Sequence, residues 1–371
     1  MNKTFKKVCL KIHLYGGLWF GVLLILLSLT GSILVFEHEI DRFLNHELLT
    51  LSKSAATATE PASIDENISE IRQFHPAKEI RFLNFPSDSS ATIEAWLGGE
   101  PEYTYVYVNP YSAEITGSRT GNSSFTTFMH ELHAHLLTGE TGSIIVGISG
   151  IVLVLLCFSG IILWIPKAGK LLKSITVTFG KKFKRVNYDL HRSVGFWTCL
   201  LLLLFAVTGS ALVFYTGSES LLGTLLNEKT ENAAPPASKP QAHDITNIYE
   251  RALDKAKGLF PEARISFLYL PQSKTDVITI RMRQPAEWHP NGRTFVYLDR
   301  YSLELKGIED GLNTKTSTSI MNMMYPLHIG SFGGYLIKWI YFITGLAPAL
   351  LTITGGIIWW LRKKKKKSVH A

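Results

Sequence analysis

Residues 12–36 read IHLYGGLWFGVLLILLSLTGSILVF, an unbroken run without Asp, Glu, Lys or Arg between Lys11 and Glu37. At about 1.5 Å per residue, such a helix crosses the roughly 30 Å hydrocarbon core of a bilayer. The run is too long for the core of a cleavable signal peptide, and no A-x-A cleavage site lies in it or directly after it. We therefore expect it to remain as a membrane anchor.

The same pattern occurs a second time. Residues 190–214 read LHRSVGFWTCLLLLLFAVTGSALVF and match the first run without a gap at 12 of 25 positions. The matches include His13 with His191, and the triplet Thr-Gly-Ser at residues 30–32 with that at 208–210. Leucines recur in any membrane helix, whereas a histidine and a Thr-Gly-Ser triplet in one register indicate a repeat.

A second pair of segments aligns in the same way. Residues 132–164 and 327–359 match without a gap and place His133 opposite His328, again with shared glycines and a terminal tryptophan. The chain is thus predicted to be a tandem duplication, each half consisting of a helix, an external domain and a second helix. Because both halves start on the same side, the repeats are parallel, related by an axis along the membrane normal.

The basic residues predict the orientation. Of the 38 Lys and Arg residues, 17 lie in three short segments, residues 1–12, 165–190 and 362–371, which contain one acidic residue between them. Clustered Lys and Arg mark cytoplasmic loops. The rest of the chain holds 29 acidic against 21 basic residues, so the net charge of +8 is a topology signal and a nucleic-acid partner is not expected. The three cysteines, Cys9, Cys157 and Cys199, lie outside the external segments, so no disulfide framework is expected.

The predicted order has four membrane helices, two external domains and basic segments on the cytoplasmic side. The bounds are a tail at 1–11, helices at 12–36, 142–165, 190–215 and 336–361, external domains at 37–140 and 216–335, a basic loop at 166–189, and a basic tail at 362–371. Pro348 predicts a kink in the fourth helix.

Each external segment has an α+β pattern after a linker, predicted at residues 52–63 and 233–240. In the first segment, residues 65–74 have helical spacing, and residues 79–85, 92–97 and 103–108 alternate as strands do. The second segment repeats these motifs: IRFLNFP at residue 80 matches ISFLYLP at residue 265. Two similar small domains are therefore expected.

Four histidines occupy duplicated positions, and the topology pairs them. His13 and His191 begin helices on the cytoplasmic side, while His133 and His328 precede helices on the external side. Two imidazoles that face each other across a bundle are a common way to hold a b-type heme. The pattern predicts two hemes b, and no C-x-x-C-H motif is present for covalent attachment.

Other side chains leave alternatives open. His130, His133 and His135 form H-x-x-H-x-H, a spacing compatible with a local metal site, and His135 is an alternative to His133 as a heme ligand. Trp288 and His289, with Tyr325, are candidate contacts for a bulky substrate. No dinucleotide, P-loop, serine-hydrolase or H-E-x-x-H motif is present.

The chain resembles the PepSY-associated transmembrane family over nearly its whole length. The resemblance rests on H-x-x-x-G-L-W and L-T-G-S-x-L-V-F-E-x-E-x-D-R-F-L-N between residues 13 and 45, on L-H-A-H-L-L-T-G-E-T-G at 132–142, and on the matching segments from residues 190 and 326. It implies PepSY-like domains in the periplasm, an inner-membrane location and a link to iron uptake, as in di-heme ferric-siderophore reductases. The implied axial ligands are His13, His191, His133 and His328.

These observations favour an oxidoreductase that passes electrons to a ferric siderophore or another ferric chelate in the periplasm. Hard oxygen ligands hold Fe³⁺ better than Fe²⁺, so one added electron loosens the complex. No flavin or NAD motif is present, so the electron donor is an unidentified partner, soluble reductant or quinol. The alternative is a PepSY-type binding or regulatory membrane protein, acting in peptidase restraint or sensing, without redox activity.

Overall fold

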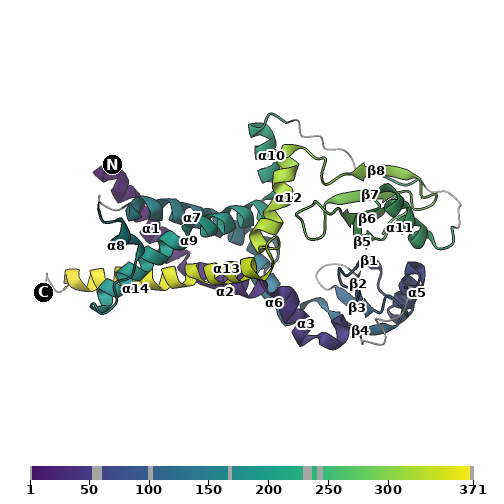
Figure 1. The fold of residues 1–371 in the computed structure, drawn as a ribbon, viewed down its shortest axis with the longest axis horizontal. Helices are drawn as coiled ribbons and strands as arrows, with labels where there is room; N and C mark the ends of the chain where they lie inside the picture. The colour runs from purple at the N-terminus through teal and green to yellow at the C-terminus, as the bar shows by residue number, and fades with distance from the viewer. Residues whose placement is uncertain are drawn as a thin grey trace. The chain divides into compact units, whose positions relative to one another are not determined.

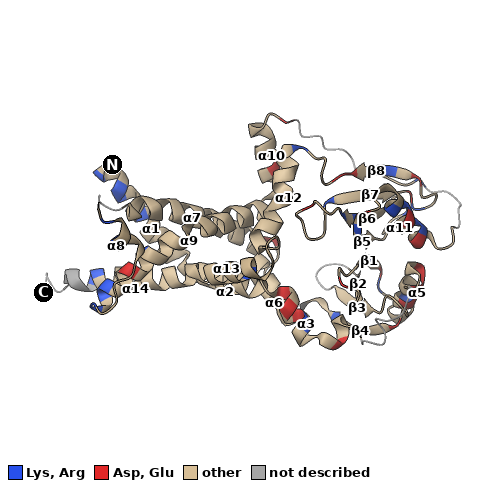
Figure 2. Ribbon diagram, in the orientation of Figure 1, with Lys and Arg blue, Asp and Glu red and all other residues tan. Residues whose placement is uncertain are grey.

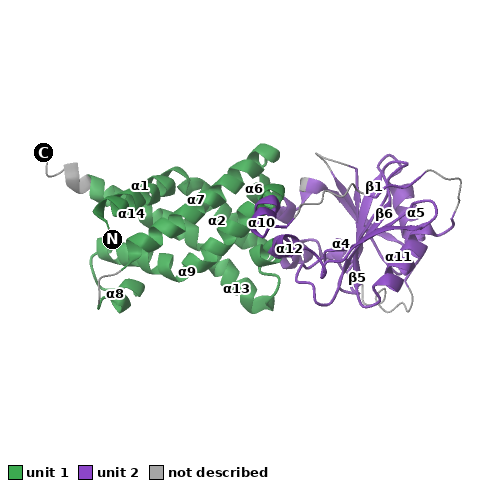
Figure 3. Cartoon of the chain, turned by 90° about the horizontal axis from the view of Figure 1, so that it is seen from above, with its two compact units in different colours: residues 1–37, 129–218, 324–371 green, residues 38–128, 219–323 purple. Residues whose placement is uncertain are grey.

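The computed structural model describes residues 2–51, 61–98, 103–165, 169–228, 236–239 and 245–367. They fall into two compact units, coloured green and purple in Figure 3. Unit 1 comprises Met1–Glu37, Met129–Ser218 and Met324–Ala371, and unit 2 comprises His38–Phe128 and Glu219–Met323. The chain therefore enters each unit more than once.

Unit 1 is a helical bundle whose long helices have the length and composition of membrane spans (Figure 1). Three helices are long and apolar enough to span a membrane, namely Glu140–Trp164 (α7), Phe183–Val213 (α9) and Gly334–Lys363, and the bent pair of α1 and α2 makes a fourth candidate if it counts as one span. Large apolar side chains lie on the outside of the bundle: Trp19 is 83% exposed, Val22 80% and Leu200 78%. Such an apolar exterior is stable when lipid surrounds it.

Two of the four candidate spans are interrupted. The predicted helix at 12–36 consists of α1 (Lys3–Trp19) and α2 (Gly21–Leu34), bent by 66° at Phe20. The fourth span consists of α13 (Gly334–Gly345) and α14 (Ala347–Lys367). This interruption, at Leu346, lies just before Pro348, whose ring clashes with the carbonyl four residues earlier in a regular helix. Gly334–Lys363 nevertheless counts as one continuous span, so the predicted kink stays a prediction. The bend at Phe20 has no proline and no clear signal in the sequence.

Glycine–serine contacts bring the helices together in a repeated way. A Cβ on Gly345 would lie 2.5 Å from Ser32 Oγ, and a Cβ on Gly150 would collide with Ser210 Oγ. Gly150 and Gly345 occupy matching positions of the aligned segments, as do Ser32 and Ser210. Small residues let helix backbones approach closely where no hydrophobic effect drives them together.

Unit 2 is built on one antiparallel eight-stranded sheet with the order β4-β3-β2-β1-β5-β6-β7-β8 (Figure 1). The strands of the first half are β1 (Ile80–Asn84), β2 (Ile93–Leu97), β3 (Thr104–Val108) and β4 (Ile115–Thr120). Those of the second half are β5 (Arg264–Tyr269), β6 (Ile278–Arg283), β7 (Thr294–Leu298) and β8 (Leu305–Glu309). The strands predicted at 79–85, 92–97 and 103–108 are confirmed.

One face of the sheet is covered by α5 (Ile64–Phe74) and α11 (Ile248–Leu259). Their apolar residues, such as Ile68, Ile71 and Ala252, form a single core with inward side chains of the strands, such as Leu83 and Leu268. Along each strand, every second side chain points to the opposite face of the sheet, which α5 and α11 do not cover. We call it the open face of the sheet.

The two external segments do not form separate sheets. β1 pairs antiparallel with β5 in the register Phe82↔Tyr269, Leu83↔Leu268 and Asn84↔Phe267, which joins both halves into one sheet. Each half alone would present an unpaired edge strand, and the pairing satisfies both edges. Most of the two predicted linkers lies outside the described residues, in the gaps 52–60, 229–235 and 240–244.

Short helices complete the chain and shift the predicted boundaries. They are α3 (Glu37–Leu44), α4 (His46–Leu49), α6 (Phe125–His135), α8 (Leu171–Ile175), α10 (Tyr215–Leu225) and α12 (Thr316–Ile329), with a 3₁₀ turn at Gly121–Ser123. The ends of α6 and α12 belong to unit 1, although residues up to 140 and 335 are predicted as external domains. The helix α1 also begins at Lys3, inside the predicted tail, and α9 begins at Phe183, inside the predicted loop.

Candidate functional site: two histidine pairs

The first pair is formed by His13 on α1 and His191 on α9. Their ring centroids lie 6.1 Å apart, and the ring planes are nearly perpendicular at 86°. Both rings are half-buried. The structure thus brings together two residues 178 positions apart that the duplication predicts as partners.

Hydrogen bonds fix how each ring of this pair is protonated. Nδ1 of His13 lies 3.1 Å from Ser159 Oγ, and Nδ1 of His191 lies 3.0 Å from Thr354 Oγ1. Each hydroxyl donates its own proton to the helix carbonyl four residues earlier, at 2.7 Å in both cases. The hydroxyl oxygen must therefore accept from Nδ1–H. Nε2 is left with a free lone pair, the state that binds a metal.

The second pair repeats this arrangement. His133 on α6 and His328 on α12 have ring centroids 6.3 Å apart, with the planes at 44°. Nδ1 of His133 lies 3.0 Å from Thr30 Oγ1, and Nδ1 of His328 lies 2.9 Å from Thr208 Oγ1. These threonines also donate to the carbonyl four residues earlier. Nε2 is again the free nitrogen.

A glycine lies against the edge of each of the four rings. A Cβ would come within 2.8 Å of His133 Cε1 at Gly31, and within 2.9 Å of His328 Cε1 at Gly209. The corresponding distances are 3.2 Å at Gly160, beside His13, and 3.2 Å at Gly355, beside His191. In every case the glycine directly follows the hydroxyl residue that holds the ring.

This hydroxyl–glycine dipeptide is the signal that the sequence reasoning missed. It occurs as Thr30-Gly31, Ser159-Gly160, Thr208-Gly209 and Thr354-Gly355. The shared Thr-Gly-Ser triplet of residues 30–32 and 208–210 indicates the repeat, but its role is visible only when the partner histidine is placed. The dipeptide positions one imidazole: the hydroxyl takes Nδ1–H, and the glycine lets the ring lie against the helix backbone.

The spacing of both pairs fits one iron between two imidazoles. An iron–nitrogen bond of about 2.0 Å and a further 1.1 Å or so from Nε2 to the ring centre place two axial imidazoles about 6.2 Å apart, centre to centre. No described residue donates or accepts a hydrogen bond at any of the four Nε2 atoms. The donor set, neutral imidazole on both sides, is that of a b-type heme.

A cavity of about 740 Å³ adjoins the first pair. His13 and His191 line it together with small residues of the same helix faces, Gly17, Gly195 and Cys199. Its lining also includes cationic side chains that could pair with heme propionates: Lys3, Lys6, Lys7, Arg192 and Arg362. A flat, anionic macrocycle therefore fits this part of the bundle in shape and in charge.

His135, the alternative ligand, lies apart from the second pair. Its Nδ1 is 2.6 Å from Ser143 Oγ on α7, and its ring centroid lies 6.2 Å from that of His130. The candidate ligand atoms of His130, Glu131 and His135 all lie within 4.8 Å of one another. The H-x-x-H-x-H motif thus divides: His133 faces His328, and the other two histidines join a glutamate in a set that could hold a divalent cation.

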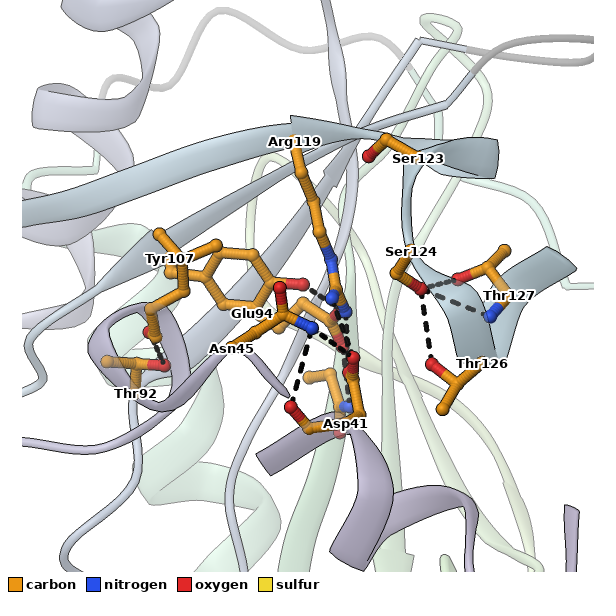
Figure 4. A network of polar contacts seen from close by, with 12 residues as sticks. Asp41, Asn45, Thr92, Glu94, Tyr107, Arg119, Ser123, Ser124, Thr126 and Thr127 are labelled. Atoms are coloured by element: carbon orange, nitrogen blue, oxygen red, sulfur yellow. Dashed lines mark hydrogen bonds and ion pairs between the residues drawn. The ribbon is translucent and has the colours of Figure 1, made fainter. Parts of the chain in front are cut away.

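In unit 2 a half-buried ion pair between Asp41 and Arg119 joins α3 to the sheet (Figure 4). Asp41 accepts two hydrogen bonds from Arg119, at 2.8 and 2.7 Å, and Tyr107 donates to Glu94 at 3.0 Å beneath it. Burial opposes the charge on Asp41, but the hydrogen bonds and the charge of Arg119 outweigh it and lower the pKa of this carboxyl. Burial, with the neighbouring Glu94, raises the pKa of Tyr107. This network is structural and reaches no histidine pair.

Comparison with known proteins gives one result. The family described as PepSY-associated TM region matches residues 10–362 of the chain, nearly its whole length. No curated protein sequence matches the chain significantly.

Proposed function

The chain is a membrane protein that belongs to the PepSY-associated transmembrane family, and from this we propose that it holds two b-type hemes and reduces ferric complexes outside the cytoplasm. The observation that carries the proposal is the presence of two histidine pairs, His13 with His191 and His133 with His328. Each has the separation of a bis-imidazole iron, and each ring has its free nitrogen selected by a hydroxyl.

The residues that would hold the hemes have separable roles. His13 and His191 would be the axial ligands of one heme, and His133 and His328 those of the other. When bound, the hemes would supply one-electron chemistry, so that an electron from a donor on one side could reach a ferric chelate on the other. The hydroxyls keep each imidazole neutral and correctly turned, which raises its basicity toward a metal.

The orientation follows from charge. The basic residues of unit 1 gather where the chain begins and ends: at the start of α1, around α8 and at the end of α14 (Figure 2). Under the positive-inside rule this end is cytoplasmic, so both termini face the cytoplasm of an inner-membrane protein. We propose accordingly that His13 and His191 hold the inner heme, and that His133 and His328 hold the outer one.

Internal symmetry supports a duplicated chain in which each half supplies one ligand to each site. The repeated glycine–serine contacts, the four hydroxyl–glycine dipeptides and the sheet order mirrored about the β1–β5 pairing all relate the first half to the second. We propose that the chain is a tandem duplication with one PepSY domain in each half. Each histidine pair takes one ligand from each half, so a single half could not complete either site.

The substrate class follows from ligand chemistry. Siderophore oxygens are hard ligands that favour Fe³⁺, and reduction to Fe²⁺ weakens the complex, so iron is released. The donor would be a partner protein, a soluble reductant or quinol. The enzyme would thus be a ferric-siderophore reductase.

The test is the heme content of the purified protein. Pyridine hemochrome analysis should give two hemes b per wild-type chain and about one for His13→Ala or for His328→Ala. His46→Ala, an exposed histidine of unit 2, is the matched control and should keep both. The wild-type protein would also be incubated with hemin. If it takes up no heme and stays colourless, the proposal is overturned and the regulatory alternative is favoured.

A further inference from the structure

Four arginines on the open face of the sheet form no ion pair with any acidic residue that the structure describes. No Asp or Glu oxygen among the described residues lies within 4.0 Å of these guanidinium groups. All four side chains are half-buried. Most of their hydrogen bonds go to neutral backbone carbonyls. The group, which we call the arginine cluster, consists of Arg264, Arg281, Arg283 and Arg293.

The fold itself does not require a charge at the centre of this cluster. Arg281 lies between the rings of Phe267 and Phe295, with its guanidinium carbon 5.5 Å from each ring centroid. At the matching position of the first half the residue is Trp96, which packs 4.8 Å from Phe82 and 4.5 Å from Tyr105. The registers are the same, Phe82↔Trp96↔Tyr105 and Phe267↔Arg281↔Phe295. An aromatic ring fills this place in one half of the sheet, and a cation fills it in the other.

Two nitrogens of the cluster lack partners although they are buried. Nε of Arg283 and Nε of Arg293 make no hydrogen bond with the described part of the chain. Buried donors are usually satisfied, so these two nitrogens leave room for an acceptor from outside the chain. Nε of Arg119 and Nε of Arg192 are also unsatisfied, but those guanidinium groups are ion-paired, and Arg283 and Arg293 are not. No hydrogen bond from the guanidinium of Arg293 to any other described residue is present.

The positive charge of the cluster is offset only in part within the chain: the charge of Glu287 acts favourably on Arg281, but four guanidinium groups lie together. Burial and the charges of Arg281, Arg293 and Arg283 lower the pKa of His289 to about 3. The acidic neighbour Glu287 is buried, and its two oxygens accept from the backbone N–H groups of residues 284 and 293, each at 2.8 Å. Its carboxylate therefore holds the loop between β6 and β7 in place.

That loop is shaped to stay close to the sheet. Gly292 has φ +71°, and a Cβ there would collide with Met282 O, so only glycine suits the position. The loop carries Trp288, which directly follows Glu287 and is 53% exposed. The segment that leads from β6 to Arg293 thus also holds an exposed aromatic side chain.

We propose that the arginine cluster binds the anionic oxygens of the ferric chelate, and that the chelate is of the catecholate or polycarboxylate class. This rests on the proposed function and narrows its substrate. Guanidinium groups form paired hydrogen bonds with carboxylate and similar oxygens. A tris-catecholate or polycarboxylate complex of Fe³⁺ carries negative charge, whereas a tris-hydroxamate complex is neutral and gains little from four cations.

The test separates binding from reduction. Ga³⁺ resembles Fe³⁺ in charge and in its preference for oxygen ligands but accepts no electron under these conditions, so Ga³⁺ chelates report binding whether or not the protein carries heme. Affinity for a Ga³⁺ tris-catecholate and for a neutral Ga³⁺ tris-hydroxamate would be measured by calorimetry on the full-length protein. The variants are Arg281→Gln and Arg293→Gln, and the control is Arg251→Gln, an exposed arginine of α11 on the covered side of the sheet.

We expect the catecholate complex to bind the wild type and to bind each cluster variant at least about tenfold more weakly, as the loss of a charge-assisted hydrogen bond implies. The control should match the wild type, and the neutral complex should bind weakly to all. Equal affinity in cluster variants and wild type overturns the proposal, as does tighter binding of the neutral complex. Displacement by an equal concentration of inorganic phosphate would also overturn it, since the site would then be one for small oxyanions.

Folding of the variants can be controlled separately. If Arg281→Gln fails to fold, Arg293→Gln carries the test, because its guanidinium makes no hydrogen bond to the described chain. Arg281→Lys, which keeps the charge but loses the paired geometry, should fall between wild type and Arg281→Gln. If the Ga³⁺ chelate does not bind but the protein contains heme, the anion site is wrong and the proposed reductase function is not affected. If the protein contains no heme but binds the Ga³⁺ chelate, the proposed function is wrong and the anion site is not affected.

Discussion

The hydroxyl that holds each imidazole should control how tightly that site keeps a heme, and Thr208→Val tests this at the outer pair. Thr208 Oγ1 accepts from His328 Nδ1–H at 2.9 Å while donating to Leu204 O at 2.7 Å. Valine keeps the shape and the γ-methyl group but removes both bonds. The ring then loses the acceptor that fixes its tautomer, and the lone pair is no longer held on Nε2.

The size of the effect follows from the bond that is lost. A neutral hydrogen bond contributes about 0.5–1.5 kcal/mol net, and the loss of an outer-shell partner of a metal-bound histidine typically lowers metal affinity by about 10–100-fold. We therefore expect heme to leave the outer site of Thr208→Val about 10-fold faster than that of the wild type. The inner site, held through Ser159 and Thr354, should be unaffected.

The assay is transfer of heme from the purified protein to an excess of a high-affinity heme scavenger, followed by absorbance. One of the two hemes should leave faster. Thr198→Val is a matched control, because Thr198 lies on the same helix and donates to the carbonyl four residues earlier at 2.8 Å, but holds no histidine. Equal transfer rates for Thr208→Val and Thr198→Val would refute the role assigned to the hydroxyl.

Three further predictions follow from other parts of the molecule. Reporter fusions at Ser90 and Lys274 should behave as periplasmic, and a cytoplasmic signal from either site would contradict the proposed orientation. His133→Ala should lose one heme while His135→Ala keeps both, as counted by pyridine hemochrome; the reverse result would exchange their roles. Because the folded pKa of Asp41 lies below its unfolded value, its ion pair stabilises unit 2 above pH 4 or so and is lost as the pH falls through the folded pKa. The thermal midpoint of wild type should therefore fall in acid, and Asp41→Asn, already lower at pH 7, should fall less; parallel curves would show that the pair does not contribute.

The sequence alone indicated the candidate membrane helices and which histidines would lie near each other, as His13 does to His191 and His133 to His328. A bilayer imposes one length and one composition on a spanning helix, so an uncharged run such as residues 12–36 can be recognised without a fold. The repeated register of His13 with His191, and of His133 with His328, predicted which rings lie on the same side. The three strands of the first external segment were also predictable, because alternation with period two is a local property of the chain.

Tertiary structure decided what depends on segments far apart in the chain. The rings of His133 and His135 contact the hydroxyls of Thr30 and Ser143, which lie on different helices, and neighbours in sequence cannot show which hydroxyl each ring will meet. The bend of 66° at Phe20 has no proline beside it that could have predicted it. The pairing of β1 with β5 joins strands about 185 residues apart, and hydrogen bonds between edge strands leave no periodic trace in either segment.

The arginine cluster illustrates the same division. Arg281 is an ordinary outward-facing residue of a strand when only its own segment is considered. Its role as a binding residue is inferred from its contacts with Phe267 and Phe295 on the neighbouring strands and from Arg293 at the end of a loop. It is inferred also because Arg281 forms no ion pair with a carboxylate of the described residues. Electrostatic energy depends on distances through space. Charge counted along the sequence can therefore predict which side of a membrane a loop occupies, but only the folded sheet shows where the charge is unpaired.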